Sequence, residues 1–188
     1  MKYIKTALGI ILIVALLLSL KQNFLDKNKK IDVTDLRNAT SEQVEATLGV
    51  TCDWDSSMSS RIFEYSHSGV TVKGDFAEGI GVVYWNGLPG GLRVEDSQYK
   101  LFNIVIGKSR VGMESAMTFL YDDKFEISED VEQELFGDRN EFPIFYCNWA
   151  NNECIVVACE KSTGIVESVT YFNDAKKVTE KLTIRGKK

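Results

Sequence analysis

Four cysteines are the residues of this sequence best suited to covalent chemistry: Cys52, Cys147, Cys154 and Cys159. No two of them form a C-x-x-C pair and the chain has one histidine, so the ligand spacing of a zinc site is missing and no metal site is expected. An even set of cysteines permits disulfides in an oxidising compartment. The crowding of three cysteines between 147 and 159 predicts at least one bridge within that segment, while the connectivity stays open.

A set of oxygen-bearing side chains follows the first cysteine. Asp53, Asp55, Ser57 and Glu64 have the spacing of an EF-hand calcium loop. Met58 fills the position at which that loop requires glycine, and the flanking residues are typical of a strand rather than of paired helices. We therefore interpret the segment as a solvated acidic loop.

The single histidine, His67, stands between Ser66 and Ser68, which invites interpretation as part of a hydrolase site. General-base catalysis needs a nucleophile within reach of an oriented base, and neighbouring residues of a strand point to opposite faces. The sequence also lacks a G-x-S-x-G elbow. No catalytic residue is expected, and His67 is interpreted as a turn residue.

Aromatic side chains are the stronger candidates for binding another molecule. Tyr84 and Trp85 are adjacent in one expected strand, as Tyr171 and its neighbour are in another, so one side chain of each pair should face away from the helices. Tryptophan and tyrosine are frequent anchors of protein interfaces. The candidate partner-binding residues are therefore Trp54, Tyr84, Trp85, Trp149 and Tyr171, with packing in the core as the alternative.

A hydrophobic run precedes all of these residues. Lys2 and Lys5 lead into it, as in an export signal, and residues 4–20 would extend roughly 25 Å as a helix, close to the ~30 Å hydrocarbon core. No small-residue cleavage site follows. The run predicts a signal-anchor that contacts the membrane, with the bulk of a single-pass protein outside the cytoplasm, or a secreted protein if the signal is cleaved. Four lysines between residues 21 and 30 count against that orientation, and a helix buried in a soluble domain is the alternative.

Composition limits the partners. The net charge of -5 argues against nucleic acid, because phosphate binding needs a basic face. The glycines at Leu88–Gly91 lack the spacing and the lysine of a phosphate-binding loop, so they are interpreted as a linker and no cofactor is expected.

The pattern of helices and strands repeats along the chain. Thr40 and Gln43 predict a capping box at the start of a helix that ends at Gly49, and strands are expected over 61–66, 70–73 and 80–85. Sliding the chain by about 69 residues places Thr40 on Ser109, and the pattern begins again.

In the second copy, Ser109 is expected to cap a helix over Arg110–Leu120 whose apolar face holds Met113, Met117 and Leu120. Strands are then expected over 142–149, 154–160 and 165–172.

The predicted fold class is α+β, with an N-terminal transmembrane helix followed by two tandem units of short helices packed on an antiparallel β-meander. The predicted domains are a signal-anchor at 1–21, a polar spacer at 22–34, a first α+β unit at 35–100, a second unit at 101–175 with an acidic insertion at 122–141, and a basic tail at 176–188.

The phrase Ile104–Ser109, followed by a helix and three strands, resembles the opening of the BamE/SmpA-like and β-lactamase-inhibitor-protein-like (BLIP-like) folds. The segment Leu48–Cys52 is similar to the glycine and cysteine that follow the helix in the inhibitor family. In that family the unit occurs twice in tandem, and the resemblance covers most of 35–173. It implies a binding or scaffolding module in the cell envelope.

The sequence thus favours a membrane-tethered, extracytoplasmic module without catalysis that binds an envelope or exported protein. A hydrolase or transferase acting in the envelope, and an inhibitor of an exported enzyme, are the alternatives.

Overall fold

The computed structural model describes residues 29–49, 60–67, 70–77, 80–85, 88–129 and 140–186. Within these ranges no helix is long and apolar enough to cross a membrane. On this finding, the predictions of a signal-anchor and of a single-pass cell-membrane protein are corrected. The run at 4–20, on which both predictions rested, lies outside the described residues.

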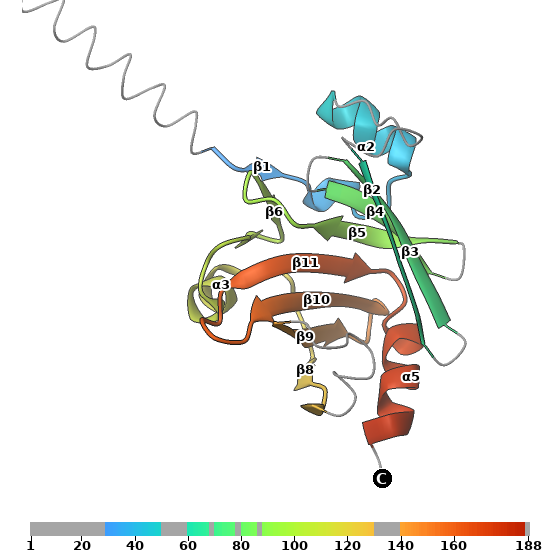
Figure 1. The fold of residues 1–188 in the computed structure, drawn as a ribbon, viewed down its shortest axis with the longest axis vertical. Helices are drawn as coiled ribbons and strands as arrows, with labels where there is room; N and C mark the ends of the chain where they lie inside the picture. Colours follow the sequence, from blue (N-terminus) through green and yellow to red (C-terminus); the bar gives the residue numbers. More distant parts are fainter. Residues whose placement is uncertain are drawn as a thin grey trace, which may run out of the picture. The chain divides into compact units, whose positions relative to one another are not determined.

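One antiparallel sheet of eight strands organises residues 32–186 (Figure 1). Its strands follow the spatial order β2-β3-β4-β5-β11-β10-β9-β8. Their bounds are β2 (Ser60–His67), β3 (Val70–Ala77), β4 (Ile80–Trp85), β5 (Leu88–Val94), β8 (Asp123–Glu126), β9 (Glu141–Asn148), β10 (Glu153–Glu160) and β11 (Val166–Phe172). Two series of sequential hairpins therefore meet where β5 pairs with β11.

This architecture corrects the predicted fold class. The strands do not form two separate units behind a transmembrane helix, because β5 and β11 join them into a continuous sheet. Strands dominate the described part of the chain, and its α-helices with assigned bounds are short: α2 (Ser41–Leu48), α3 (Arg110–Ala116) and α5 (Ala175–Gly186).

The largest difference from the sequence prediction lies at Leu88–Gly91, which is part of β5 rather than a linker. Gly91 is the register partner of Phe172, and a Cβ atom at Gly91 would lie 1.7 Å from the backbone oxygen of Tyr171. The backbone N–H of Asn173 donates to the Gly90 oxygen at 2.7 Å. Glycine is needed here because the two strands approach more closely than a side chain allows.

A second, three-stranded sheet has the order β1-β6-β7, with β1 (Ile31–Asp32), β6 (Tyr99–Leu101) and β7 (Ile104–Val105). The Val33 N–H donates to the Lys100 oxygen at 3.0 Å, and the Lys100 ammonium pairs with Asp32 at 3.1 Å. A short 3-10 helix, η1 (Thr34–Leu36), follows β1.

Local sequence signals explain where two helices begin. The Thr40 hydroxyl accepts from the Gln43 N–H and the Gln43 side chain accepts from the Thr40 N–H, so the predicted capping box is confirmed. Gly49 ends α2 with φ 69°, as predicted. Ser109 caps α3 by accepting from the Gly112 N–H. However, α3 ends at Ala116 instead of reaching Leu120.

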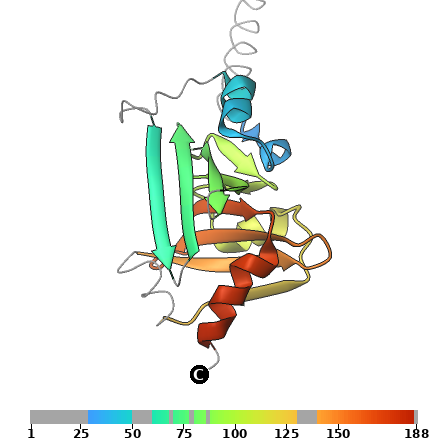
Figure 2. The same ribbon diagram turned by 90° about the vertical axis from the view of Figure 1, so that its right-hand side faces the viewer.

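The segment expected as a basic tail forms α5, which lies along one face of the sheet near its β9–β11 side (Figure 2). Ala175 and Val178 of this helix are buried in a small core with Phe145, Phe172 and two cysteines. Burial of this apolar stripe explains why a segment with several lysines folds as a helix.

Among the described residues, two clusters of buried side chains lie on opposite faces of the sheet, because side chains alternate along each strand. Ile144 and Tyr146 of β9 lie in the larger core, together with Met113 of α3 and Val44 of α2. Phe145, between the two β9 residues, faces the smaller core under α5.

Candidate binding surface

The residues proposed from the sequence for partner binding have different places in the structure. Trp54 lies outside the described residues, as does Cys52. Tyr84 and Trp85 belong to β4, where they pair with Pro89 and Leu88 of β5. Nothing further is described for these two side chains.

Tyr171 is a core residue with 1% of its surface exposed. Its hydroxyl donates to the Glu153 carboxylate at 2.8 Å, and the Arg37 guanidinium lies 3.9 Å from the same oxygen. Burial, together with the hydrogen bond to Glu153, raises the pKa of Tyr171 well above its usual value. Tyr171 therefore links the sheet to the segment after η1 and is not accessible to a partner.

Trp149 is exposed, and two more exposed large apolar side chains lie on a segment that is hydrogen-bonded to the end of β9. The exposed fractions are 36% for Trp149, 82% for Leu120 and 42% for Tyr121. We call these three residues the apolar corner. Ile31 and Val111 are the further exposed large hydrophobic residues in the described part of the chain.

Hydrogen bonds hold the two segments of the apolar corner together. The Asn148 side chain donates to the Leu120 carbonyl at 3.0 Å, and the Trp149 N–H donates to the Asp122 carboxylate at 3.0 Å. The Asp122 N–H in turn donates to the Cys147 carbonyl at 2.8 Å. Residues 120–122, which lead into β8, are therefore fixed against the end of β9.

The start of α5 supports the turn that carries Trp149. Asn152 has φ 56°, and its backbone oxygen accepts from the Ala175 N–H at 2.9 Å. The Asn152 side chain donates to Asp174 and accepts from the Lys176 N–H, at 3.1 and 3.0 Å. These bonds fasten the turn to a helix, so Trp149 is held on a rigid support rather than on a free loop.

A buried tyrosine backs the apolar corner. The Tyr121 ring packs edge-on against Tyr146, with the ring centroids 5.0 Å apart. The Tyr146 hydroxyl donates to Glu114 at 2.7 Å, and the Lys124 ammonium pairs with the same carboxylate. Burial and the Glu114 hydrogen bond raise the pKa of Tyr146, so the phenol stays protonated as a donor. The Lys124 hydrogen bond leads the causes that lower the pKa of Glu114.

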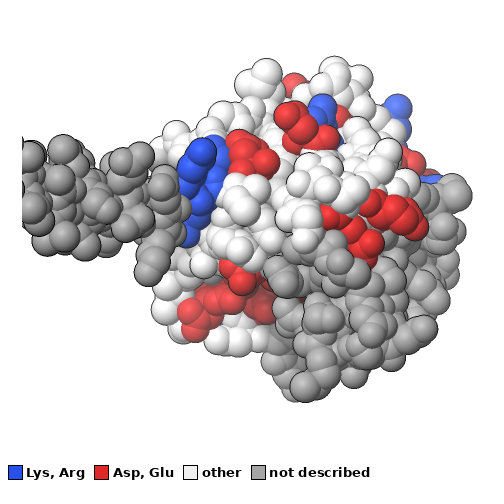
Figure 3. Space-filling model, turned by 90° about the horizontal axis from the view of Figure 1, so that it is seen from above, with Lys and Arg blue, Asp and Glu red and all other residues white. Residues whose placement is uncertain are grey.

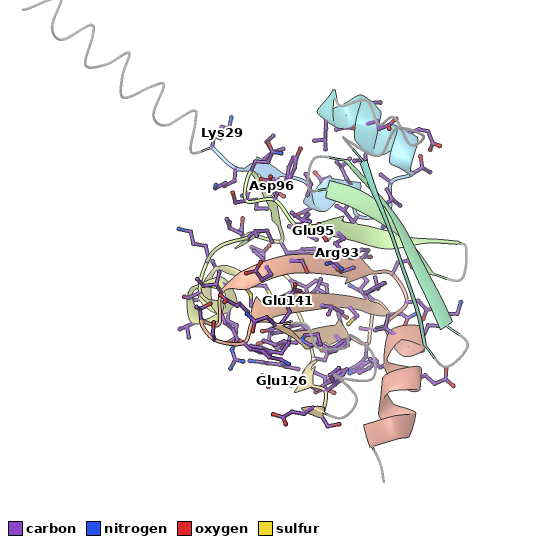
Figure 4. The ribbon with its side chains drawn as sticks, viewed as in Figure 1. Lys29, Arg93, Glu95, Asp96, Glu126 and Glu141 are labelled. Atoms are coloured by element: carbon purple, nitrogen blue, oxygen red, sulfur yellow. The ribbon has the colours of Figure 1, made fainter. Side chains whose placement is uncertain are left out.

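Charged groups surround this part of the sheet in pairs. Arg110 of α3 pairs with Glu126 of β8 at 2.9 Å. In Figure 4, Glu126 lies at the β8 end of the sheet, apart from Arg93 and Glu95 near β5, which form their own pair at 2.9 Å. Acidic side chains form several patches on the face seen in Figure 3. Nearer the apolar corner, the polar side chains of Asn148 and Asp122 bond to its backbone, and polar groups at the border of an apolar patch are ordinary in protein interfaces.

The three cysteines that the structure describes lie inside the protein. Cys147, Cys154 and Cys159 are buried and unbridged. Among the residues that the structure describes, no group of three or more His, Cys, Asp or Glu side chains is placed to hold a metal ion. His67 ends β2, opposite Val70 of β3, and its side chain is not among those described.

Leu120 and Tyr121 were missed by sequence reasoning. Leu120 follows Met113 and Met117 at helical spacing. The sequence therefore predicted that Leu120 lies on the buried face of a longer helix. The helix stops instead, because the chain turns so that the Thr118 N–H donates to the Phe102 oxygen at 2.9 Å. No local signal in the sequence distinguishes these two outcomes.

Comparison of the chain with protein-family models, with curated proteins and with solved structures finds no match in any of the three.

Proposed function

We propose that the protein is a binding module without catalytic activity, and that it binds a folded protein partner through the apolar corner. The observation that carries the proposal is that Leu120, Tyr121 and Trp149 are all exposed and lie on two segments that are hydrogen-bonded to each other. The partner would present an apolar pocket that receives Trp149 and Leu120.

Energetics favour burial of these side chains in a complex. Removing a large apolar side chain from water is worth about 1.5–3 kcal/mol. Because Leu120 is 82% exposed, folding alone gains little of this free energy at that side chain. Clustered apolar surface with a polar rim is typical of interaction sites. Tyrosine and tryptophan frequently supply the central anchors.

Rigidity adds to this argument. An interface residue that is ordered only upon binding costs conformational entropy, which lowers the affinity. The turn of Trp149 is already ordered by Asn152 and the start of α5, and the Leu120 segment is ordered by Asn148. The apolar corner could therefore bind with little rearrangement.

Site-specific photo-crosslinking tests the surface. A photoreactive side chain at Tyr121 of the full-length protein, exposed to an extract of its native cells, should give a discrete crosslinked product. The same group at Val111 is the matched control, because Val111 is 79% exposed but lies on α3. Identical products from both positions, or none from Tyr121, would contradict the proposal.

Substitutions then test which side chains contribute. Trp149→Ser and Leu120→Ser should each reduce capture of the crosslinked partner at least tenfold, since anchor residues contribute about 2 kcal/mol or more. Val111→Ser should leave capture unchanged. If the Trp149 and Leu120 variants capture the partner as well as the wild type does, the binding surface lies elsewhere.

A further inference from the structure

Two thiols face each other across the β9–β10 hairpin. Cys147 and Cys154 are register partners on these strands, and both side chains are fully buried in the smaller core. Their sulfur atoms are 3.1 Å apart. Phe145, Phe172 and Val178 complete this core, which α5 helps to cover.

The backbone geometry of this pair suits a covalent bond. The Cys147 carbonyl accepts from the Asp122 N–H, so it points toward the β8 side and away from β10. The two polar backbone groups of a strand residue point the same way, and Cys147 and Cys154 are therefore a non-hydrogen-bonded pair. Such pairs bring Cα atoms to about 4.5 Å and their side chains closest together, which lies within the range that disulfides span.

The third described cysteine is not an alternative partner. Cys159 lies five positions beyond Cys154 on the same strand, and alternation places it on the opposite face of the sheet. It is buried in the larger core, opposite Phe142. Burial raises the pKa of its thiol to about 11, which fits an inert core residue.

We propose that Cys147 and Cys154 form a disulfide bond that closes the β9–β10 hairpin beneath α5 and fixes the turn carrying Trp149. The proposal does not depend on the binding function, because it concerns these two sulfur atoms alone. It selects one pairing from those that the sequence left open.

Bond formation requires a disulfide oxidant such as oxidised glutathione. A Cys147 or Cys154 thiolate attacks one sulfur of the oxidant and releases one molecule of reduced thiol. The second cysteine attacks the resulting mixed disulfide and releases the other. The two protein thiols thereby lose two protons and two electrons, which leave with the two released thiols.

Burial determines when this exchange can happen. The hydrogen bond with Cys147, and then burial, raise the pKa of the Cys154 thiol, so the folded protein holds little of the Cys154 thiolate, and both sulfur atoms are buried away from a disulfide oxidant. Exchange therefore proceeds while the hairpin is formed but α5 has not yet docked, and the finished bond is shielded from reductants afterwards.

Peptide mapping is the direct test. Full-length protein is refolded from denaturant with oxidised glutathione, its remaining thiols are alkylated under denaturing conditions, and it is digested without reduction. We expect a peptide that links Cys147 to Cys154, lighter by two hydrogen atoms than its reduced form, and an alkylated Cys159. Alkylation of both Cys147 and Cys154, or a link from either one to another cysteine, would overturn the proposal.

Thermal unfolding gives a second measurement. The bond closes a short loop, so protein that is reduced in denaturant and refolded with dithiothreitol should have a Tm about 5–10 °C below that of the oxidised protein. The double variant Cys147→Val, Cys154→Val preserves apolar packing, and dithiothreitol should not change its Tm. A wild type insensitive to the reductant, or a double variant equally sensitive to it, would refute the proposed bond. Mapping of the wild type decides the question if the variant does not fold.

Discussion

The centre of the sheet and its β8 end use the same kinds of residue for different purposes. At the centre, where β5 pairs with β11, Leu92 and Tyr171 are almost completely buried and Gly91 leaves no room for a side chain. At the β8 end, Leu120 and Tyr121 face solvent. The centre maintains the fold, whereas the end has apolar surface that the fold does not bury.

The comparison shows that residue type alone does not assign a role. Tyr171 is buried and donates to Glu153, whereas Tyr121 is 42% exposed and its ring makes a T-shaped contact with Tyr146. A residue contributes to stability according to what surrounds it, and an exposed one remains available to a partner.

The largest effect is expected for Gly91→Ala at the centre. The added Cβ would lie 1.7 Å from the Tyr171 oxygen, which is backbone and cannot rotate away. Overpacking of this kind costs about 3 kcal/mol or more, so the free energy of unfolding in urea should fall by that amount. The strands β5 and β11 would have to move apart to accommodate the methyl group.

Gly112→Ala is the matched control for this substitution. Gly112 is in α3, and its nearest neighbour to an added Cβ is the Ser109 hydroxyl at 3.4 Å, an ordinary contact. Alanine is the better helix former, so this variant should be unchanged or more stable by up to about 1 kcal/mol. Equal losses in both variants would show that the β5–β11 junction is not especially tight.

The same contrast explains how much of the fold was predictable. The capping box at Thr40 and the cap at Ser109 depend on residues three positions away, and the sequence identified both. β5 was missed because the local signals in Leu88–Gly91 indicate a break, whereas the reason for these glycines is a strand about 80 residues away.

The candidate site was predictable only in part, for a related reason. Trp149 was identified from its type, since tryptophan is a frequent anchor. Leu120 was assigned to a helix face, and only the tertiary bond from Thr118 to Phe102 ends that helix early. The sequence also predicted a bridge among the three clustered cysteines. It could not identify which two cysteines form the bridge, because the strand register decides which cysteine side chains lie opposite each other on the same face of the sheet.

A smaller effect is expected at the β8 end for Glu114→Gln. Glu114 accepts from the Tyr146 hydroxyl and pairs with Lys124, so loss of its charge should cost about 1 kcal/mol of unfolding free energy at neutral pH. The pKa of Glu114 is lowered below its ordinary value of 4.5 in the folded protein. Its contribution is therefore complete above that value and is lost as the pH falls through the folded pKa.

Urea unfolding of the wild type and the Glu114→Gln variant, measured from neutral pH downward, checks this prediction. The two curves should be separated at neutral pH and should converge below 4.5. A separation that persists unchanged into acid would mean that the carboxylate charge does not stabilise the β8 end.

The smallest effect on stability is expected for Leu120→Ala in the apolar corner. Leu120 is 82% exposed, so truncation removes little buried surface, and the free energy of unfolding should change by no more than about 0.5 kcal/mol. Leu92→Ala is the reference, because Leu92 is fully buried at the sheet centre and should lose about 3 kcal/mol. If both substitutions destabilise alike, Leu120 supports the fold and cannot be a surface reserved for a partner. A stable Leu120→Ala protein that loses partner capture would separate the two roles, since only binding then depends on that side chain.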